Sequence, residues 1–95
     1  MGTYMALVDV VEARVQNAQE LASVWGDLRN DIADVGGEMK DAYAILGDHD
    51  YLILFEAPDH QTALQISLVV ERRGLDMHTH ELLPVEEFGS LVQDV

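Results

Sequence analysis

The stretch from Asp41 to Pro58, DAYAILGDHDYLILFEAP, decides the fold of this 95-residue chain. Two runs rich in apolar, aromatic and β-branched residues flank four turn residues, Gly47-Asp48-His49-Asp50. Aromatic and β-branched side chains favour strands, whereas glycine and aspartate favour tight turns. The stretch therefore predicts a β-hairpin, with strands over residues 38–46 and 51–57.

The half of the chain before the hairpin predicts a strand and a helix. Residues 3–11, TYMALVDVV, are apolar at nearly every position, which is typical of a buried strand. Between residues 15 and 35, apolar side chains recur three and four positions apart, as in an amphipathic helix. Trp25 lies on this apolar stripe and is predicted to be a core residue. The pair Gly36-Gly37 supplies the C-cap that ends the helix.

The half after the hairpin predicts a helix, a strand and a short terminal helix. Asp59 is a good N-cap for a helix over residues 60–73. Arg72 and Arg73 would then lie in its last turn, where the helix dipole favours cations. Residues 75–83 form the fourth strand-like run, and Pro84 opens an acidic segment with helical periodicity.

This order of elements predicts an α+β fold, the ferredoxin-like βαββαβ plait. We expect a four-stranded antiparallel sheet, two helices on one face and a short C-terminal helix, in a single domain over residues 1–95. The first and third strands would be central. The charged residues of the second and fourth strands, such as Lys40, Asp41 and Glu81, would protect the sheet edges.

Two helices cover only one face of such a sheet, yet both faces are apolar. Along the third strand, Tyr51, Ile53 and Phe55 point to one face, and Leu52 and Leu54 point to the other. An uncovered apolar face needs a partner, so we expect a homodimer that buries about 800 Å² per chain.

The charge balance excludes two classes of partner. Eighteen acidic residues oppose five basic ones, and the formal net charge is −13. Such a surface repels phosphate backbones and anionic lipids, so we expect neither nucleic acid nor membrane binding. Asp31 and Asp34 lie in the last turns of the first predicted helix, where the dipole disfavours anions. We interpret the dispersed acidic coat as that of a halophilic protein, and the alternative is an acidic patch for a basic partner.

The composition also bears on the compartment. There is no cysteine, which excludes disulfides and thiolate metal sites. We see no signal peptide and no apolar run near the roughly 20 residues that span a bilayer. These features favour a cytoplasmic protein.

Several motifs spread over most of the chain are similar to those of a known family. They are GTYMALV at the start, GG-E-x-K-D-x-Y from Gly36 to Tyr43, L-G-x-x-D from Leu46 to Asp50, E-A-P-D from Glu56 to Asp59, and P-x-E-E-F from Pro84 to Phe88. On these motifs the chain resembles the GYD-domain family of the dimeric α/β-barrel superfamily. The resemblance implies a back-to-back dimer that forms a barrel.

The chain departs from the family at the signature that gives it its name. Gly47 and Asp50 match the glycine and the aspartate, but His49 stands where the tyrosine would be. The resemblance implies little about activity, because the family is largely without assigned function. Superfamily relatives include cofactor-free monooxygenases, haem enzymes and isomerases, so the fold alone does not choose among them.

Few polar side chains interrupt the apolar segments, and these are the candidate ligand-binding residues. They are Tyr43, His49, Asp50, His78 and His80. We expect a mostly apolar ligand site between the sheet and its helices, near the turn and the fourth strand. Asp50 could act as a general base, but bonding to backbone amides of the turn is favoured, and Gly47 is expected to serve the geometry of the turn.

The pair His78 and His80 raises the question of a metal. Residues two apart on a strand share a face, so both imidazoles could grip one ion if His49, Glu81 or Asp50 supplied a third ligand. The sequence favours two solvated histidines on an edge strand, and we expect no metal and no cofactor. Which sheet face the two histidines occupy stays open.

Three classes of function follow. The favoured one is a non-enzymatic homodimer that binds a small apolar ligand or has a regulatory role. The first alternative is a cofactor-independent monooxygenase or isomerase, and the second is a structural or interaction protein. A ligand-sized cavity lined by Tyr43, His78 or His80 would favour the first two, and catalytic residues stay unassigned.

Overall fold

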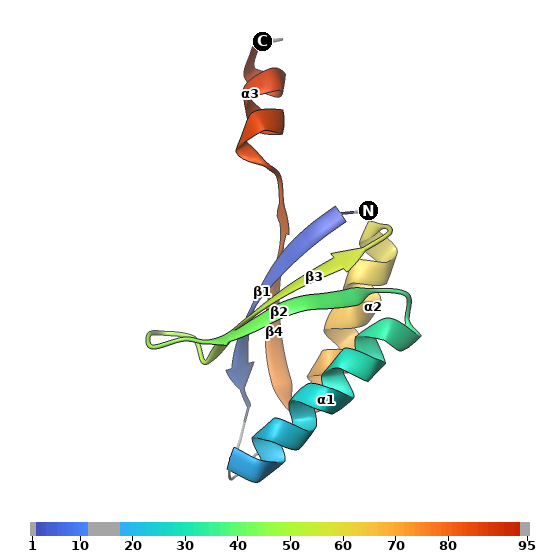
Figure 1. Ribbon diagram of the computed structural model, residues 1–95, viewed down its shortest axis with the longest axis vertical. Helices are drawn as coiled ribbons and strands as arrows, with labels where there is room; N and C mark the ends of the chain where they lie inside the picture. Colours follow the sequence, from blue (N-terminus) through green and yellow to red (C-terminus); the bar gives the residue numbers. More distant parts are fainter. Residues whose placement is uncertain (1, 12–17, 94–95) are drawn as a thin grey trace.

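The computed structural model describes residues 2–11 and 18–93 of the chain, and in the first helix it describes side chains from residue 23 onward. The described residues form four strands and three helices (Figure 1). In chain order these elements are β1 (Gly2–Val10), α1 (Ala18–Asp34), β2 (Glu38–Ala44), β3 (Tyr51–Ala57), α2 (His60–Glu71), β4 (Leu75–Leu82) and α3 (Val85–Gln93).

The sheet has the predicted topology. Its strands pair in the order β2-β3-β1-β4, and each neighbouring pair is antiparallel. β1 and β3 are central, while β2 and β4 form the edges. Both α1 and α2 lie on the same side of the sheet (Figure 1). The α+β ferredoxin-like plait with a short C-terminal helix is therefore confirmed.

The hydrophobic core lies between the sheet and the two helices. From Ile53 onward every second residue of β3 is buried against the helices, including Phe55, whereas Leu52 and Leu54 are half-buried on the opposite face. This is the predicted alternation, because successive side chains of a strand point to opposite faces. The largest fully buried side chains are those of Phe55, Leu28, Ile32, Ile53, Ile66, Val8 and Val70.

The first helix ends at the glycine pair, as predicted. Gly36 takes a positive φ of 98°, and the Gly36 and Gly37 amides donate to the carbonyls of Ala33 and Ile32 at 3.0 and 2.9 Å. Gly37 has a second role, because a Cβ there would collide with the side chain of the buried Ile66. The expected start of this helix at residue 15 lies outside the described residues.

The second helix begins as predicted but ends two residues early. The carboxylate of Asp59 accepts a 2.7 Å hydrogen bond from the Thr62 amide, which makes it the N-cap. At the other end Arg72 is the C-cap, so the two arginines do not lie in the last turn. The chain turns away there because Gly74 has a φ of 84°, and Arg73 instead pairs with Asp31 of α1 at 2.9 Å.

The hairpin connection is longer than the predicted four residues. β2 ends at Ala44, which pairs with Tyr51, so six residues connect the strands. The Ile45 amide donates to the carbonyl of Asp50 at 2.9 Å and closes this turn. β2 also contains a bulge between Met39 and Asp41, an irregularity that is common in edge strands.

The sheet face away from α1 and α2 is called the helix-free face. Its centre consists of Met5 and Leu7 of β1 and Leu52 and Leu54 of β3, all half-buried. α3 leaves the end of β4 and stands apart from the sheet (Figure 1). Its apolar side chains are exposed, for example Phe88 at 58%. None of the helices in the described part of the chain has the length and apolar character needed to cross a membrane.

Candidate functional site

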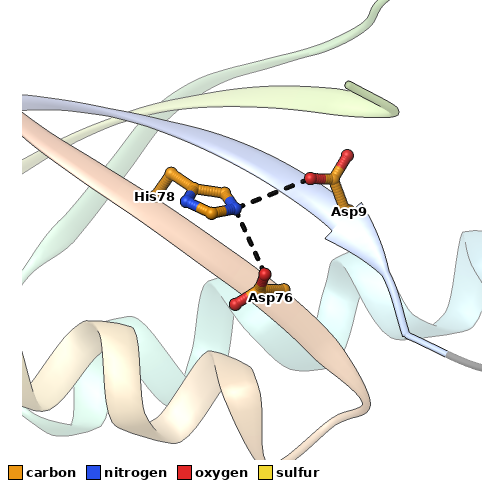
Figure 2. Close-up of side chains that lie close together, drawn as sticks. All are labelled: Asp9, Asp76 and His78. Atoms are coloured by element: carbon orange, nitrogen blue, oxygen red, sulfur yellow. Dashed lines mark ion pairs between the residues drawn. The ribbon is translucent and has the colours of Figure 1, made fainter. Parts of the chain in front are cut away.

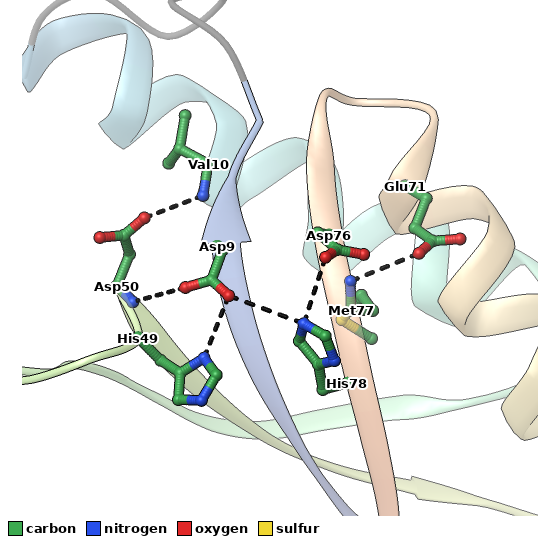
Figure 3. Close-up of polar contacts among 8 residues, drawn as sticks. All are labelled: Asp9, Val10, His49, Asp50, Glu71, Asp76, Met77 and His78. Atoms are coloured by element: carbon green, nitrogen blue, oxygen red, sulfur yellow. Dashed lines mark hydrogen bonds and ion pairs between the residues drawn. The ribbon is translucent and has the colours of Figure 1, made fainter.

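Polar side chains from three segments gather at one corner of the helix-free face. Asp9 comes from the end of β1, His49 from the hairpin turn, and Asp76 and His78 from the start of β4 (Figure 3). These four residues are called the Asp–His cluster. The register of β1 with β4 creates this cluster. Asp9 lies directly opposite Asp76, and Leu7, two residues before Asp9 on the same face, lies opposite His78.

Within the cluster, His49 is bonded to Asp9. The distance from His49 Nδ1 to Asp9 Oδ2 is 3.0 Å. An ionised carboxylate only accepts hydrogen bonds, so Nδ1 carries the proton and donates it. This hydrogen bond lowers the pKa of Asp9 below its ordinary value, against the opposing effect of partial burial. Asp9 is therefore a carboxylate at neutral pH.

His78 lies between the two aspartates. Its Nε2 atom is 3.1 Å from Asp76 Oδ2 and 3.7 Å from Asp9 Oδ2 (Figure 2). The rings of His49 and His78 approach each other, with 5.6 Å between centroids. Two imidazoles and two carboxylates are thus directed toward one another on the surface of the sheet.

Asp50 has the structural role that the sequence favoured, with different partners. Its carboxylate accepts a 2.9 Å hydrogen bond from the Val10 amide, and its own amide donates to Asp9 Oδ1 at 3.2 Å (Figure 3). These bonds tie the hairpin turn to the end of β1 rather than to amides of the turn. Asp50 therefore holds His49 beside Asp9.

The structure does not unite the five candidate residues in one site. His78 and His80 lie on the helix-free face, opposite Leu7 and Met5, because Leu75 and Met77 of the same strand fill the helix side. The sequence left open which face these two histidines occupy, and on the helix-free face they cannot serve a site between the sheet and its helices. Tyr43 lies on β2, where it pairs with Leu52 of β3, and β2 is at the opposite edge of the sheet from β4.

Tyr43 instead borders a separate apolar hollow of about 240 Å³. The residues that line it are Trp25, Ala42, Tyr43, Ala44 and Tyr51. The rings of Trp25 and Tyr51 meet edge to face, with 5.1 Å between centroids. This hollow lies where α1 passes the hairpin strands, on the helix side of the sheet.

Sequence reasoning missed four residues of these two sites. Asp9 carries a signal, because it is the single charged residue in the apolar run of the first strand. Asp76 also carries a signal, because it lies two residues before His78 and four before His80 and therefore shares their face of β4. Trp25 was expected in the core and Tyr51 on the same strand face as Ile53 and Phe55, and both also line the hollow.

Comparison with known proteins agrees with the motifs. A search of curated proteins found no match to this chain. The family model described as GYD domain matches residues 4–92, nearly the whole sequence. On this match, and with the fold that it accompanies, the chain belongs to the GYD domain family.

Proposed function

We propose that this GYD-family protein is a non-enzymatic homodimer that binds a small apolar ligand. The observation that carries the proposal is the hollow that Trp25, Tyr51 and residues 42–44 of β2 line. Ligand sites are concave and mostly apolar, with a few oriented polar groups. The hollow has this character, since its walls are aromatic rings and alanine side chains.

The size and chemistry of the hollow limit the ligand. An apolar cavity of about 150 Å³ is enough to bind benzene. A hollow of about 240 Å³ therefore suits a flat molecule of one or two rings. The Trp25 indole N–H and the Tyr51 hydroxyl offer one polar handle each, because both rings combine an apolar body with a polar tip.

The homodimer rests on the helix-free face. Met5, Leu7, Leu52 and Leu54 form its apolar centre and are half-buried in the single chain. The exposed apolar side of α3 adds Phe88 and Leu91 beyond the end of the sheet. A second copy placed face to face would cover the sheet centre and give α3 a surface to pack on. This arrangement leaves the hollow on the other side of the sheet accessible.

Titration with 2-naphthol, a neutral two-ring probe, tests ligand binding. Trp25 is the only tryptophan in the chain, so its indole N–H gives one assignable NMR signal. We expect this signal to move in a saturable manner. Ala44→Leu fills the hollow and should weaken binding about tenfold or more. The larger side chain occupies the space that the probe needs.

The matched control for this experiment is Ala33→Leu, which adds the same side chain at an exposed position of α1. It should leave the affinity unchanged. A linear, non-saturating response, or equal affinity in the Ala44→Leu and wild-type proteins, would refute the proposed site.

One observation favours the alternative of a cofactor-independent monooxygenase or isomerase. Asp9 accepts the Nδ1 proton of His49, which leaves Nε2 free to act as a general base. Oxygen consumption with a panel of small hydroquinones tests the monooxygenase function. We expect no turnover. Activity that His49→Gln abolishes and Ala44→Leu retains would replace the binding proposal with the enzymatic one.

A further inference from the structure

We propose that Asp9, Asp76 and His78 form a binding site for a divalent transition-metal ion, with Zn²⁺ or Co²⁺ as the best-matched ions. This site is separate from the proposed ligand hollow, which lies on the other side of the sheet. The sequence suggested only the pair His78 and His80 as the basis of a metal site and favoured two solvated histidines on an edge strand. The fold instead directs His78 toward two aspartates that are distant in sequence (Figure 2).

The three donor atoms already lie close to the positions that a metal requires. One oxygen of each aspartate and one nitrogen of His78 all lie within 4.8 Å of one another. Donors about 2.0–2.2 Å from a tetrahedral zinc ion are about 3.3–3.6 Å from each other. His78 Nε2 is 3.1 Å from Asp76 and 3.7 Å from Asp9, so small side-chain movements bring both pairs to this spacing.

The negative charges at this corner of the sheet also favour the binding of a cation. Asp9 and Asp76 are directly opposite each other on neighbouring strands. Like charges in such cross-strand pairs are destabilising, and the whole chain carries a net charge of −13. A divalent ion between the two carboxylates would neutralise this repulsion.

Asp9 is also held in place by hydrogen bonds from residues that are not ligands themselves. The amide of Asp50 donates to Asp9 Oδ1 at 3.2 Å, and His49 donates to Oδ2 at 3.0 Å. Protein metal ligands are commonly held by such outer hydrogen bonds, which fix the carboxylate and tune the affinity. Oδ2 retains a second lone pair for the ion. His49 is therefore assigned the role of a positioning residue for Asp9.

The donor set determines which metals fit. One imidazole and two carboxylates suit zinc and its first-row neighbours, whereas Mg²⁺ and Ca²⁺ prefer oxygen donors alone. Three protein ligands leave a fourth position open for water or a small anion, as in open zinc sites. The site lies on strands that belong to the rigid sheet, which favours a fixed geometry.

Zinc titration of the full chain, first stripped with a chelator, tests the proposal. The titration is run without and with millimolar Mg²⁺, which occupies sites that attract cations by charge alone. We expect one zinc ion per chain by calorimetry and a saturable shift of the His78 ring signals in NMR. Co²⁺ should give the visible absorption of a four-coordinate ion. Asp76→Asn and His78→Gln should each weaken binding at least tenfold.

Two variants are the matched controls. His80→Gln removes the other histidine of the same strand and face. Glu81→Gln breaks another exposed histidine–carboxylate pair, in which His60 Nε2 lies 3.2 Å from the glutamate. Both should bind zinc as the wild-type protein does. Folding of Asp76→Asn is checked by its amide spectrum and is expected, because the substitution removes a like-charge contact.

Three results would overturn the site. One is a zinc affinity that survives Asp76→Asn, and another is a loss of affinity in His80→Gln that equals the loss in His78→Gln. The third is a zinc response that disappears in millimolar Mg²⁺, because this would identify simple charge screening. The test is independent of ligand binding in the hollow, which the Trp25 signal reports.

Discussion

The two faces of the sheet differ although the same strands build both. Toward the helices, Ile53 and Phe55 of β3 have no exposed surface. On the helix-free face their neighbours Leu52 and Leu54 are only half-buried. The chain's own helices thus bury one face completely, and this is called the completed face, whereas the helix-free face leaves apolar surface partly exposed. Substitutions of neighbouring residues on one strand should therefore separate folding from assembly.

The largest effect is expected on the completed face. Phe55→Ala removes a fully buried ring that stacks on Tyr4, with 5.4 Å between centroids. The cavity should lower the free energy of unfolding by about 3–5 kcal/mol. Urea unfolding followed by circular dichroism measures this loss. A loss below about 1 kcal/mol would mean that the helix side is not the stable core.

The next effect belongs to the helix-free face. Leu54→Asp places a charge at the centre of the proposed dimer interface, where burial of an unpaired charge costs several kcal/mol. Native mass spectrometry should show twice the 10.6 kDa chain mass for the wild-type protein and a single chain for the variant. The control is Leu64→Asp, at a position that is 63% exposed on α2. A wild-type protein that is monomeric at micromolar concentration in high salt would remove the dimer from the proposal.

Salt should affect both faces together, and more moderately. The net charge of −13 is spread over a small domain, so self-repulsion weakens the folded state. Ions screen such repulsion beyond about 10 Å at 0.1 M. We expect the melting temperature to rise between low and molar KCl. Chloride must be compared with sulfate, which also strengthens apolar burial. A flat or falling melting temperature would contradict the interpretation of the chain as halophilic.

The smallest effect is expected at the N-cap of α2, on the completed side. The hydrogen bond from the Thr62 amide lowers the pKa of Asp59 below its ordinary value of 3.8. The folded state therefore binds this proton less readily than the unfolded state does. The resulting stabilisation is present above the ordinary pKa and is lost as the pH falls through the lower folded value.

Asp59→Asn is the variant that isolates this contribution, because asparagine caps helices but does not titrate. Its stability should decline less steeply than that of the wild-type protein between about pH 5 and pH 2, the range in which carboxylates take up protons. Thermal melts over this range measure the slope. Identical slopes in the two proteins would show that Asp59 does not contribute to acid unfolding.

The fold was predictable because its signals are local. The alternation in β3, the glycine pair after α1 and the Asp59 cap each act within a few residues, and all three are found in the structure. The predicted ends of helices and strands differ from the observed ends by one or two residues. These differences arise where tertiary contacts decide, as at Arg73, which leaves α2 and pairs with Asp31.

The sites were less predictable because they depend on contacts between distant segments. Asp9 meets Asp76 only through the register of β1 with β4, which no local pattern encodes. His49 reaches Asp9 because the six-residue turn folds back onto β1 through Asp50. Trp25 meets Tyr51 through the packing of α1 on β3. In each case the residue types were visible in the sequence, but their neighbours were not.

The missing side chain of Gly37 has a consequence for the solubility of the protein. This glycine begins the path into β2, and its bare Cα lets Ile32 of α1 and Ile66 of α2 approach the edge of the sheet. Side chains of both helices therefore meet at the glycine that leads into the edge strand. A residue with a Cβ would force the side chains of Ile66 and Ile32 to shift at this junction. We therefore expect that a larger residue at position 37 loosens this end of β2 and lets its outer backbone groups pair with strands of other molecules.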